Sequence, residues 1–251
     1  MQSKPLSFND DAGLYDKMRP GYPKEVFTKL QAITGLNQGS HILEIGCGSG
    51  QATRSLVDIT RHIVCVDPGE NLLAVARVKF PDLTFVNSTF EDYVTDERYN
   101  LIISATAWHW VNPKVAYKKA HELLKDDGYL AVLRNDHIET DPDAFHNKAD
   151  FIYKRYSNPD VMGDDQKVTD DQAVLLENQY FHVVETVGFP WEQTYTIDEY
   201  IALRNTYSDH RTMDRDKRLE LEKELRDFAH RHYNDKITKH YVAVLFLARK
   251  I

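Results

Sequence analysis

Short apolar runs alternate with helical segments between residues 41 and 134, and this alternation constrains the fold more than any other feature of the chain. The runs are rich in β-branched residues, as in buried strands, while the apolar residues between them recur every three or four positions. Parallel strands need crossover connections, which helices supply, so the pattern predicts an α/β fold with a doubly wound, mostly parallel sheet. The five expected strands are HILEI, HIVCV, LTFVN, YNLIISA and GYLAVLR.

Breaks in this alternation divide the chain into three stretches. Residues 1–135 hold an N-terminal arm, expected to be irregular over 8–23, followed by a helix and the five-stranded core. Residues 136–185 are predicted to form a helical cap insertion, because Asn158-Pro159 and Gly163 interrupt aromatic and charged helical pieces. Residues 186–251 contain the strands WEQTYTI and HYVAVLFLAR, which complete a seven-stranded sheet.

Charge and composition disfavour several classes of partner. The 251 residues carry a formal net charge of −8, whereas binding to a nucleic acid backbone depends on clustered Lys and Arg. No run of 18 apolar residues and no apolar signal segment occurs, so we expect no membrane partner and a cytoplasmic location. Cys47 and Cys65 are then reduced thiols. No metal is expected, since His230 and His232, two residues apart on a helix, point to different sides.

Three alternating glycines follow the first strand: Gly46, Gly48 and Gly50. Glycine lets a turn approach a ligand closely at the N-terminus of the next helix, where unpaired N–H groups face outward. A dinucleotide site would need glycine at position 51, which is Gln51, and Glu44 before the turn would repel a pyrophosphate. Asp67 ends the second strand, where a carboxylate can accept hydrogen bonds from both ribose hydroxyls. The pattern therefore favours an adenosine-like ligand that is cationic or zwitterionic.

At these residues the chain resembles the class I S-adenosylmethionine-dependent methyltransferases, whose first motif is a strand ending in Glu/Asp-x-Gly-x-Gly-x-Gly. The resemblance implies a Rossmann-like methyltransferase fold, S-adenosyl-L-methionine as the cofactor, and residues 1–135 as the arm and cofactor-binding core. Glu44 would orient the methionine amino end, the segment NSTFEDY would flank the adenine, and Tyr15 and Arg19 would close over the cofactor. The implied cofactor-binding residues are Tyr15, Arg19, Glu44, Gly46, Cys47, Gly48, Gly50, Asp67, Pro68, Thr89, Phe90 and Glu91.

The segments LYDKMRPGYP and TYSDH resemble a subgroup of small-molecule methyltransferases akin to trans-aconitate methyltransferase. This resemblance implies a small-molecule acceptor, with an O- or carboxylate-type acceptor favoured and no nucleic acid substrate. Arg19 could pair with the carboxylate of the cofactor or with an anionic substrate. Tyr207, His210 and Arg211 are weaker candidates for contacts with the substrate.

The fourth strand runs into SATAWHWVNP, which places Trp108, His109 and Trp110 at the carboxyl end of the sheet, where sites of this fold lie. We expect these three residues to be catalytic and to face the methyl group, because aromatic faces attract a sulfonium and His109 could accept a proton. For each Trp the alternative is burial in the core, and for Asp67 it is a helix N-cap before Pro68.

Two other functions are alternatives at this point, an NAD-dependent reductase and a non-catalytic module that binds S-adenosylmethionine. The glycine spacing and the absence of Tyr-x-x-x-Lys from the chain disfavour the reductase. The filled aromatic motif after the fourth strand favours an enzyme over the module. The sequence predicts no particular oligomeric state.

Overall fold

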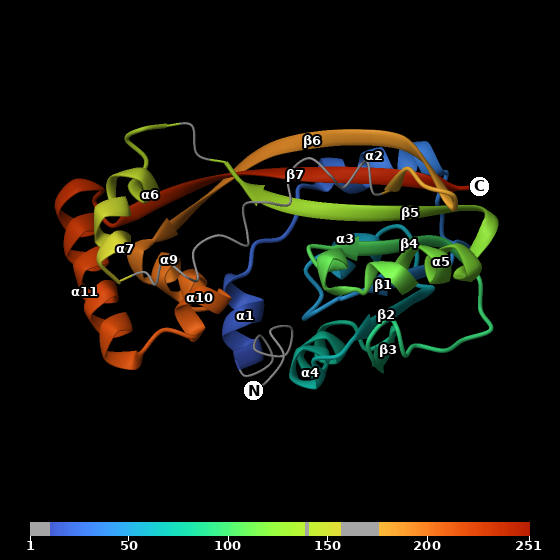
Figure 1. The fold of residues 1–251 in the computed structure, drawn as a ribbon, viewed down its shortest axis with the longest axis horizontal. Helices are drawn as coiled ribbons and strands as arrows, with labels where there is room; N and C mark the ends of the chain where they lie inside the picture. Colours follow the sequence, from blue (N-terminus) through green and yellow to red (C-terminus); the bar gives the residue numbers. More distant parts are fainter. Residues whose placement is uncertain (1–10, 139–140, 157–175) are drawn as a thin grey trace.

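The computed structural model describes residues 11–138, 141–156 and 176–251, which form a seven-stranded sheet, its flanking helices and a helical lobe (Figure 1). The strand order is β3-β2-β1-β4-β5-β7-β6, and β7 runs antiparallel to both of its neighbours while the other pairs are parallel. The chain starts near the middle of the sheet and winds to each edge in turn, which confirms the doubly wound, mostly parallel fold. The strands are β1 (Ile42–Ile45), β2 (Ile63–Asp67), β3 (Thr84–Asn87), β4 (Tyr99–Ala105), β5 (Leu124–His137), β6 (Phe181–Thr196) and β7 (Lys236–Lys250). The helices are α1 (Ala12–Met18), α2 (Lys24–Thr34), α3 (Thr53–Leu56), α4 (Glu70–Lys79), the short 3-10 helix η2 (Trp108–Trp110), α5 (Pro113–Leu123), α6 (Phe145–Lys148), α7 (Asp150–Tyr156), α9 (Ile197–Arg204), α10 (Ser208–Arg211) and α11 (Arg215–His232).

Alternate residues of the central strands face opposite sides of the sheet, as strand geometry requires. In β1, Ile42 packs into one apolar core and Leu43 into another, and both side chains are fully buried. The first core also takes Leu30 from α2 and Leu56 from α3, and the second takes Ala120 from α5. Because helices cover both faces, the central strands are continuous apolar runs in the sequence.

The last strands differ in length from those expected from the pattern. Strand β6 begins at Phe181, inside the stretch that the sequence assigns to the cap. It lies at the edge of the sheet and pairs with β7, so its side chains alternate between half-buried and exposed positions. Gly188 and Pro190 interrupt its apolar pattern, and for that reason periodicity did not reveal the full strand.

The helical lobe lies beside the sheet, around the C-terminal end of β6 and the N-terminal end of β7 (Figure 1). Its apolar core combines Phe145 and Ile152 from α6 and α7 with Tyr200 and Leu225 from α9 and α11. The helices therefore come from both the expected cap and the C-terminal stretch, which pack together as one layer. The expected turn residues Asn158-Pro159 and Gly163 lie outside the described residues.

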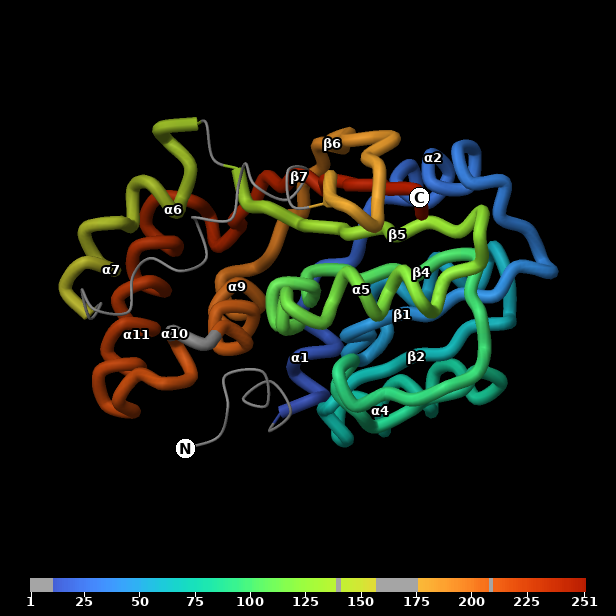
Figure 2. Tube along the Cα trace, turned by 45° about the vertical axis from the view of Figure 1, so that its right-hand side comes forward, coloured from blue at the N-terminus to red at the C-terminus, as the bar shows by residue number. Residues whose placement is uncertain are grey.

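The N-terminal arm contains a helix, α1, where the sequence suggested irregular structure. Asp11 caps this helix by accepting a 3.0 Å hydrogen bond from the backbone N–H of Leu14. Helix α1 lies between the lobe and the sheet (Figures 1 and 2), where Asp16 pairs with Lys79 of α4 at 2.5 Å and Met18 joins the lobe core. These tertiary contacts hold a helix of two turns that would be marginal alone.

Candidate active site

The glycine turn after β1 is crowded at both of its ends. Its three glycines, Gly46, Gly48 and Gly50, all adopt positive φ angles, of 67°, 55° and 93°. A Cβ atom on Gly46 would lie 2.3 Å from Cβ of Ala107, and one on Gly50 would lie 2.6 Å from the ring of Phe80. Both sterics and backbone conformation therefore require glycine at these two positions.

The middle of the turn has room for a side-chain carbon. A Cβ atom on Gly48 would meet Gln51 Oε1 at 3.6 Å and Tyr15 Cε1 at 3.8 Å, which are ordinary contact distances. Gly48 itself is buried, and the Tyr15 ring of α1 lies over it on this side. A turn without side chains at its glycines is the kind that lets backbone groups approach a ligand closely, as the adenosine-like ligand expected from the sequence needs.

Asp67 joins this turn to the end of β2. Its Oδ2 accepts a 2.9 Å hydrogen bond from the Gly48 N–H, and its Oδ1 accepts one of 2.7 Å from Gly69 N–H. Burial raises the pKa of Asp67, and the two N–H donors oppose that shift. The N-cap residue of helix α4 is Gly69, so Asp67 is not the N-cap. Asp67 and the half-buried Pro68 belong to the turn that precedes the helix.

Glu44 lies beneath the turn and is 1% exposed. Its Oε2 accepts a 2.6 Å hydrogen bond from Thr53 Oγ1 and faces the thiol of Cys65 at 3.8 Å. Burial raises the pKa of Glu44 to about 7, against the hydrogen bonds from Thr53 and Cys65, which lower it. Cys47 is buried in the same place, and burial raises the pKa of its thiol. The carboxylate therefore anchors α3 below the turn, and both thiols are poorly reactive.

Two arm residues, Tyr15 and Arg19, cover the turn from the other side. Burial raises the pKa of Tyr15, Arg19 lowers it, and the negative charge of Asp67 raises it further, which places the phenol near that carboxylate. The Arg19 guanidinium lies 5.1 Å from the Tyr15 ring centre and 4.3 Å from that of Tyr207. Its Nη2 donates a 3.0 Å hydrogen bond to the carbonyl of Thr206 in the lobe. The structure thus brings Tyr15, Arg19 and the weaker candidate Tyr207 together.

A second set of contacts fixes the loop that follows α1, and the sequence reasoning missed it. The Tyr22 hydroxyl and Thr106 Oγ1 share a 2.6 Å hydrogen bond at the end of β4. Thr106 has a positive φ of 55°, uncommon for a residue with a side chain and often found at functional sites. Asn135 of β5 donates a 3.1 Å hydrogen bond to the Gly21 carbonyl and accepts one of 3.0 Å from Trp191 Nε1. No sequence pattern signals a left-handed threonine or a hydrogen bond between distant segments.

In the segment expected to flank the adenine, residues 87–93, the candidate side chains make contacts within the protein. Thr89 accepts a 3.2 Å hydrogen bond from the Asp92 N–H, Phe90 is 3% exposed, and Glu91 Oε1 accepts a 2.7 Å hydrogen bond from the Asn112 N–H. The Ser88 N–H donates a 3.2 Å hydrogen bond to the carbonyl of Asp67, so the segment is joined to the residue expected to bind the ribose. The segment therefore stands beside the glycine turn, with these three side chains turned to structural contacts.

The aromatic motif after β4 divides into a buried and an exposed part. Trp108 is 5% exposed and packs at 6.1 Å from the Phe90 ring and 5.7 Å from the Tyr117 ring. Trp110 is 42% exposed and lies 4.7 Å from the exposed His109 ring. The burial of Trp108 matches the core alternative weighed for this residue, whereas His109 and Trp110 are accessible at the end of β4.

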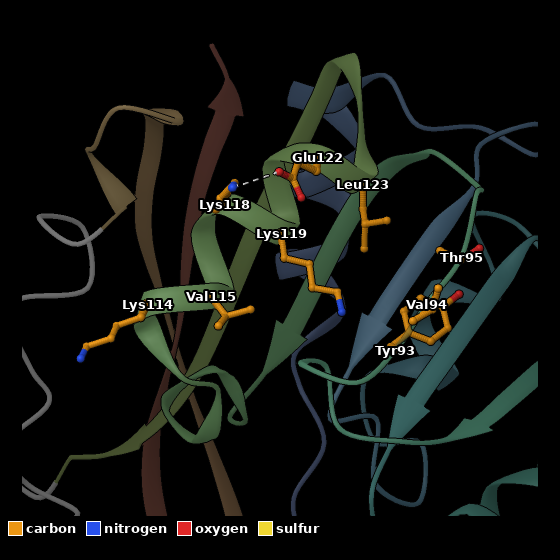
Figure 3. A pocket seen from close by; sticks show the side chains of 9 residues that line it. All are labelled: Tyr93, Val94, Thr95, Lys114, Val115, Lys118, Lys119, Glu122 and Leu123. Carbon is orange, nitrogen blue, oxygen red and sulfur yellow. Dashed lines mark ion pairs between the residues drawn. The ribbon is translucent and has the colours of Figure 1, made fainter.

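A surface hollow of about 430 Å³ lies between α5 and the segment at 93–95, away from the glycine turn (Figure 3). Lys119 reaches into it and donates a 2.8 Å hydrogen bond to the Glu91 carbonyl. Neither the glycine turn nor the arm lines this hollow, so we do not assign the cofactor to it. Within the described residues, no three His, Cys, Asp or Glu side chains gather as a metal site needs, and no helix is long and apolar enough to cross a membrane.

The strand order, the glycine turn and the acid that ends β2 define a Rossmann-like fold of the class I methyltransferase type. Residues 43–132, from β1 to β5, match a family model described as a methyltransferase domain. An uncharacterized methyltransferase-like protein of Schizosaccharomyces pombe is 28% identical over 204 residues, which are 80% of this chain and 77% of that protein. An uncharacterized methyltransferase of Mycobacterium bovis is 31% identical over 135 residues, which are 53% of this chain, and the match spans about half, 54%, of that protein.

Solved structures share the fold at low sequence identity. A proposed type II methyltransferase from Anaeromyxobacter dehalogenans aligns with a TM-score of 0.67 and 19% identity over 92% of this chain and 97% of that chain. A methyltransferase from Thiobacillus denitrificans, solved with S-adenosyl-L-homocysteine, aligns with a TM-score of 0.53 and 14% identity over 100% and 99% of the two chains. Residues 43–132 thus match a methyltransferase domain, whose cofactor is S-adenosylmethionine, and the chain as a whole shares the fold of the solved methyltransferases.

Proposed function

We propose that this chain methylates a small molecule at an oxygen atom, of the hydroxyl or carboxylate type, with S-adenosylmethionine as the methyl donor. The observation that carries the proposal is the hydrogen bond of 2.9 Å from the Gly48 N–H to Asp67 Oδ2. It fixes the glycine turn beside a carboxylate, under the side chains of Tyr15 and Arg19. An adenosine and an amino acid portion both find partners in such an arrangement.

The residues around the turn have separate tasks in this proposal. Each oxygen of Asp67 receives one backbone N–H and keeps further lone-pair capacity for the hydroxyls of a ribose. Glu44 acts through Thr53, because its hydrogen bond of 2.6 Å sets the start of α3 and thereby the turn above it. Arg19 supplies a positive charge on the arm, suited to the carboxylate of the methionine portion.

When bound, S-adenosylmethionine supplies an electrophilic methyl group, which an oxygen lone pair of the acceptor takes as the sulfur–carbon bond breaks. The task of the protein is to line up the acceptor and keep water away. His109 and Trp110 are accessible at the end of β4, which supports assigning to His109 the task of accepting the proton of a hydroxyl acceptor. A carboxylate acceptor would need no base.

Calorimetry with the full chain tests the cofactor first. We expect S-adenosylhomocysteine to bind with one site per chain and NADH to give no binding heat. Incubation with methyl-labelled S-adenosylmethionine and a panel of small acids, alcohols and phenols then tests the reaction, read as labelled product and released S-adenosylhomocysteine. Absence of S-adenosylhomocysteine binding would overturn the proposal, and binding without turnover on any acceptor would favour a sensing module.

A further inference from the structure

Two hydroxyl groups from distant parts of the chain meet at the carboxyl end of β4. The segment between α1 and α2 passes the ends of β4 and β5 (Figure 1), where the Tyr22 hydroxyl lies 2.6 Å from Thr106 Oγ1 and Asn135 donates a hydrogen bond to the Gly21 carbonyl. The reacting groups of open α/β sheets lie beyond this end of the strands. We call Tyr22 and Thr106 the hydroxyl pair.

The backbone at Thr106 is held in an unfavourable conformation. Its φ of 55° lies in the left-handed region, which β-branched residues rarely adopt. Its N–H donates a 2.8 Å hydrogen bond to the Leu133 carbonyl of β5, and its side chain is exposed. Strained conformations persist where surrounding contacts hold them, and they are concentrated at active sites. Glycine would adopt this φ without strain, so the position retains a strained residue that carries a hydroxyl group.

The hydroxyl pair adjoins both the glycine turn and the exposed part of the aromatic motif. Ala107, the residue after Thr106, packs against the turn, since a Cβ atom on Gly46 would lie 2.3 Å from the Cβ of Ala107. His109, three positions after Thr106, is exposed on η2. The pair therefore stands between the groups assigned to the cofactor and the imidazole assigned to the proton of the acceptor.

The hydroxyl pair has one O–H more than its internal hydrogen bond uses. Burial raises the pKa of the Tyr22 phenol, the hydrogen bond with Thr106 lowers it, the charge of Glu44 raises it and that of Arg19 lowers it. The raised pKa keeps the phenol protonated at neutral pH, so the pair holds two O–H donors, of which one serves the bond between them. Among the residues that the structure describes, neither side chain makes a further hydrogen bond, so one donor remains.

We propose that the hydroxyl pair holds the acceptor, by donating its remaining O–H to the oxygen atom that receives the methyl group. This inference rests on the proposed function, because it assigns a task in the same reaction. The hydrogen bond occupies one lone pair of that oxygen and leaves another to form the bond to the methyl carbon, while the electrons of the sulfur–carbon bond stay on sulfur. The pair gains and loses no proton, and a hydroxyl acceptor passes its proton to His109.

Two variants at Thr106 test this task. Thr106→Ser and Thr106→Ala both lose the γ-methyl group, and only the second loses the hydroxyl. Thr194→Ala is the control, since it breaks another hydroxyl pair of 2.8 Å, with Thr238, which joins β6 to β7. Tyr22→Phe removes the hydrogen bond from its other end and replaces Thr106→Ala if that variant does not fold.

Binding to the full chain saturated with S-adenosylhomocysteine gives the first readout. The probes are benzoate, followed by calorimetry, and 4-nitrophenolate, whose absorption band moves to shorter wavelength when its oxygen accepts a hydrogen bond. We expect at least one probe to bind the wild type, Thr106→Ser and Thr194→Ala with affinities within about threefold of each other. Thr106→Ala should bind it about 10-fold more weakly or worse, and the band shift of bound 4-nitrophenolate should be lost.

Turnover of an acceptor found in the panel gives the second readout. Thr106→Ala should lower kcat/KM about 30-fold or more, whereas its affinity for S-adenosylhomocysteine should fall only a few fold through a looser arm. Thr106→Ser should keep most of the turnover. A pair that merely anchors the arm would lower both quantities in the same proportion.

The outcomes separate this inference from the proposed function. Failure of the wild type to bind S-adenosylhomocysteine, or to turn over any acceptor, would overturn the proposed function itself. If the wild type binds S-adenosylhomocysteine but neither probe, if Thr106→Ala equals Thr106→Ser, or if kcat/KM and cofactor affinity fall equally, the task of the hydroxyl pair alone is refuted.

Discussion

The backbone N–H of Gly48 donates a 2.9 Å hydrogen bond to Oδ2 of Asp67, and these two residues lie 19 positions apart in the chain. The glycine turn and the end of β2 therefore act as one unit. Asp67 also holds Gly69, and the Ser88 N–H binds its carbonyl, so three segments of the proposed cofactor site converge on this residue. Changes at Asp67 should affect the affinity for the cofactor more than changes at any neighbouring acid.

Replacement of Asp67 by Ala should weaken binding of S-adenosylhomocysteine by about 10- to 100-fold, since a hydrogen bond to a charged group contributes ~1.5–3 kcal/mol. Calorimetry measures the effect. Asp82→Ala, at an exposed position before β3, serves as the control and should bind like the wild type. Equal affinities of the two variants would remove Asp67 from the site.

Replacement of Gly46 by Ala should destabilise the fold by about 1–3 kcal/mol or more, because the residue has φ 67° and its Cβ would lie 2.3 Å from Cβ of Ala107. Urea unfolding monitors the loss. The double variant with Ala107→Gly removes the clash but not the strained φ, so it should recover part of the stability. A single variant as stable as the wild type would show that the turn rearranges.

Glu44 should make stability depend on pH. Its pKa is about 7 in the fold against an ordinary value of 4.5, so the folded state binds this proton more tightly. Its contribution to stability is therefore full below pH ~4.5 and is lost as pH rises towards 7. Glu44→Gln keeps an acceptor for Thr53 and loses this dependence, so its stability relative to the wild type should improve by up to about 3 kcal/mol between pH 5 and 8.

Urea unfolding at four pH values checks this expectation, with the exposed Glu97→Gln as the control. Parallel pH profiles for Glu44→Gln and the wild type would mean that Glu44 stays charged in the fold.

Replacement of Tyr22 by Phe should loosen the arm, because it removes the 2.6 Å hydrogen bond to Thr106 and with it about 0.5–1.5 kcal/mol. Affinity for S-adenosylhomocysteine should fall a few fold. Tyr233→Phe removes a hydrogen bond of the same length, 2.6 Å, to the Asp143 carbonyl in the lobe, and its affinity should not change. Calorimetry separates the two, and equal affinities would argue against a role of the arm in cofactor binding.

The two tryptophans after β4 should respond differently to truncation. Trp108→Ala should cost about 3–5 kcal/mol of stability, since the ring is 5% exposed and packed in the core. Trp110→Ala, at a position 42% exposed, should change stability by less than about 0.5 kcal/mol and lower turnover. Unfolding curves and initial rates measure both, and an unchanged rate in the Trp110 variant would exclude that ring from the methyl-transfer pocket.

The sequence by itself determined the sheet and the glycine turn, because both depend on local patterns. The buried strands β1, β2 and β4 are mostly apolar runs, and Gly46 and Gly50 stand where the positive φ and the lack of space both require glycine. The resemblance of the glycine motif also indicated S-adenosylmethionine as the cofactor. These features need no information about which distant segments meet.

Tertiary structure alone decided the remainder. The sequence allowed Trp108 to be either exposed or buried, and it is buried because its ring packs against Phe90 and Tyr117. Helix α1 and the left-handed Thr106 are stabilised by partners far away in the chain, and no local preference predicts either. The lobe brings Arg204 of α9 and Lys239 of β7 to the same aromatic cluster through long-range packing. Periodicity specifies which face of an element is buried, but the element against which that face packs is set by the free energy of the whole fold.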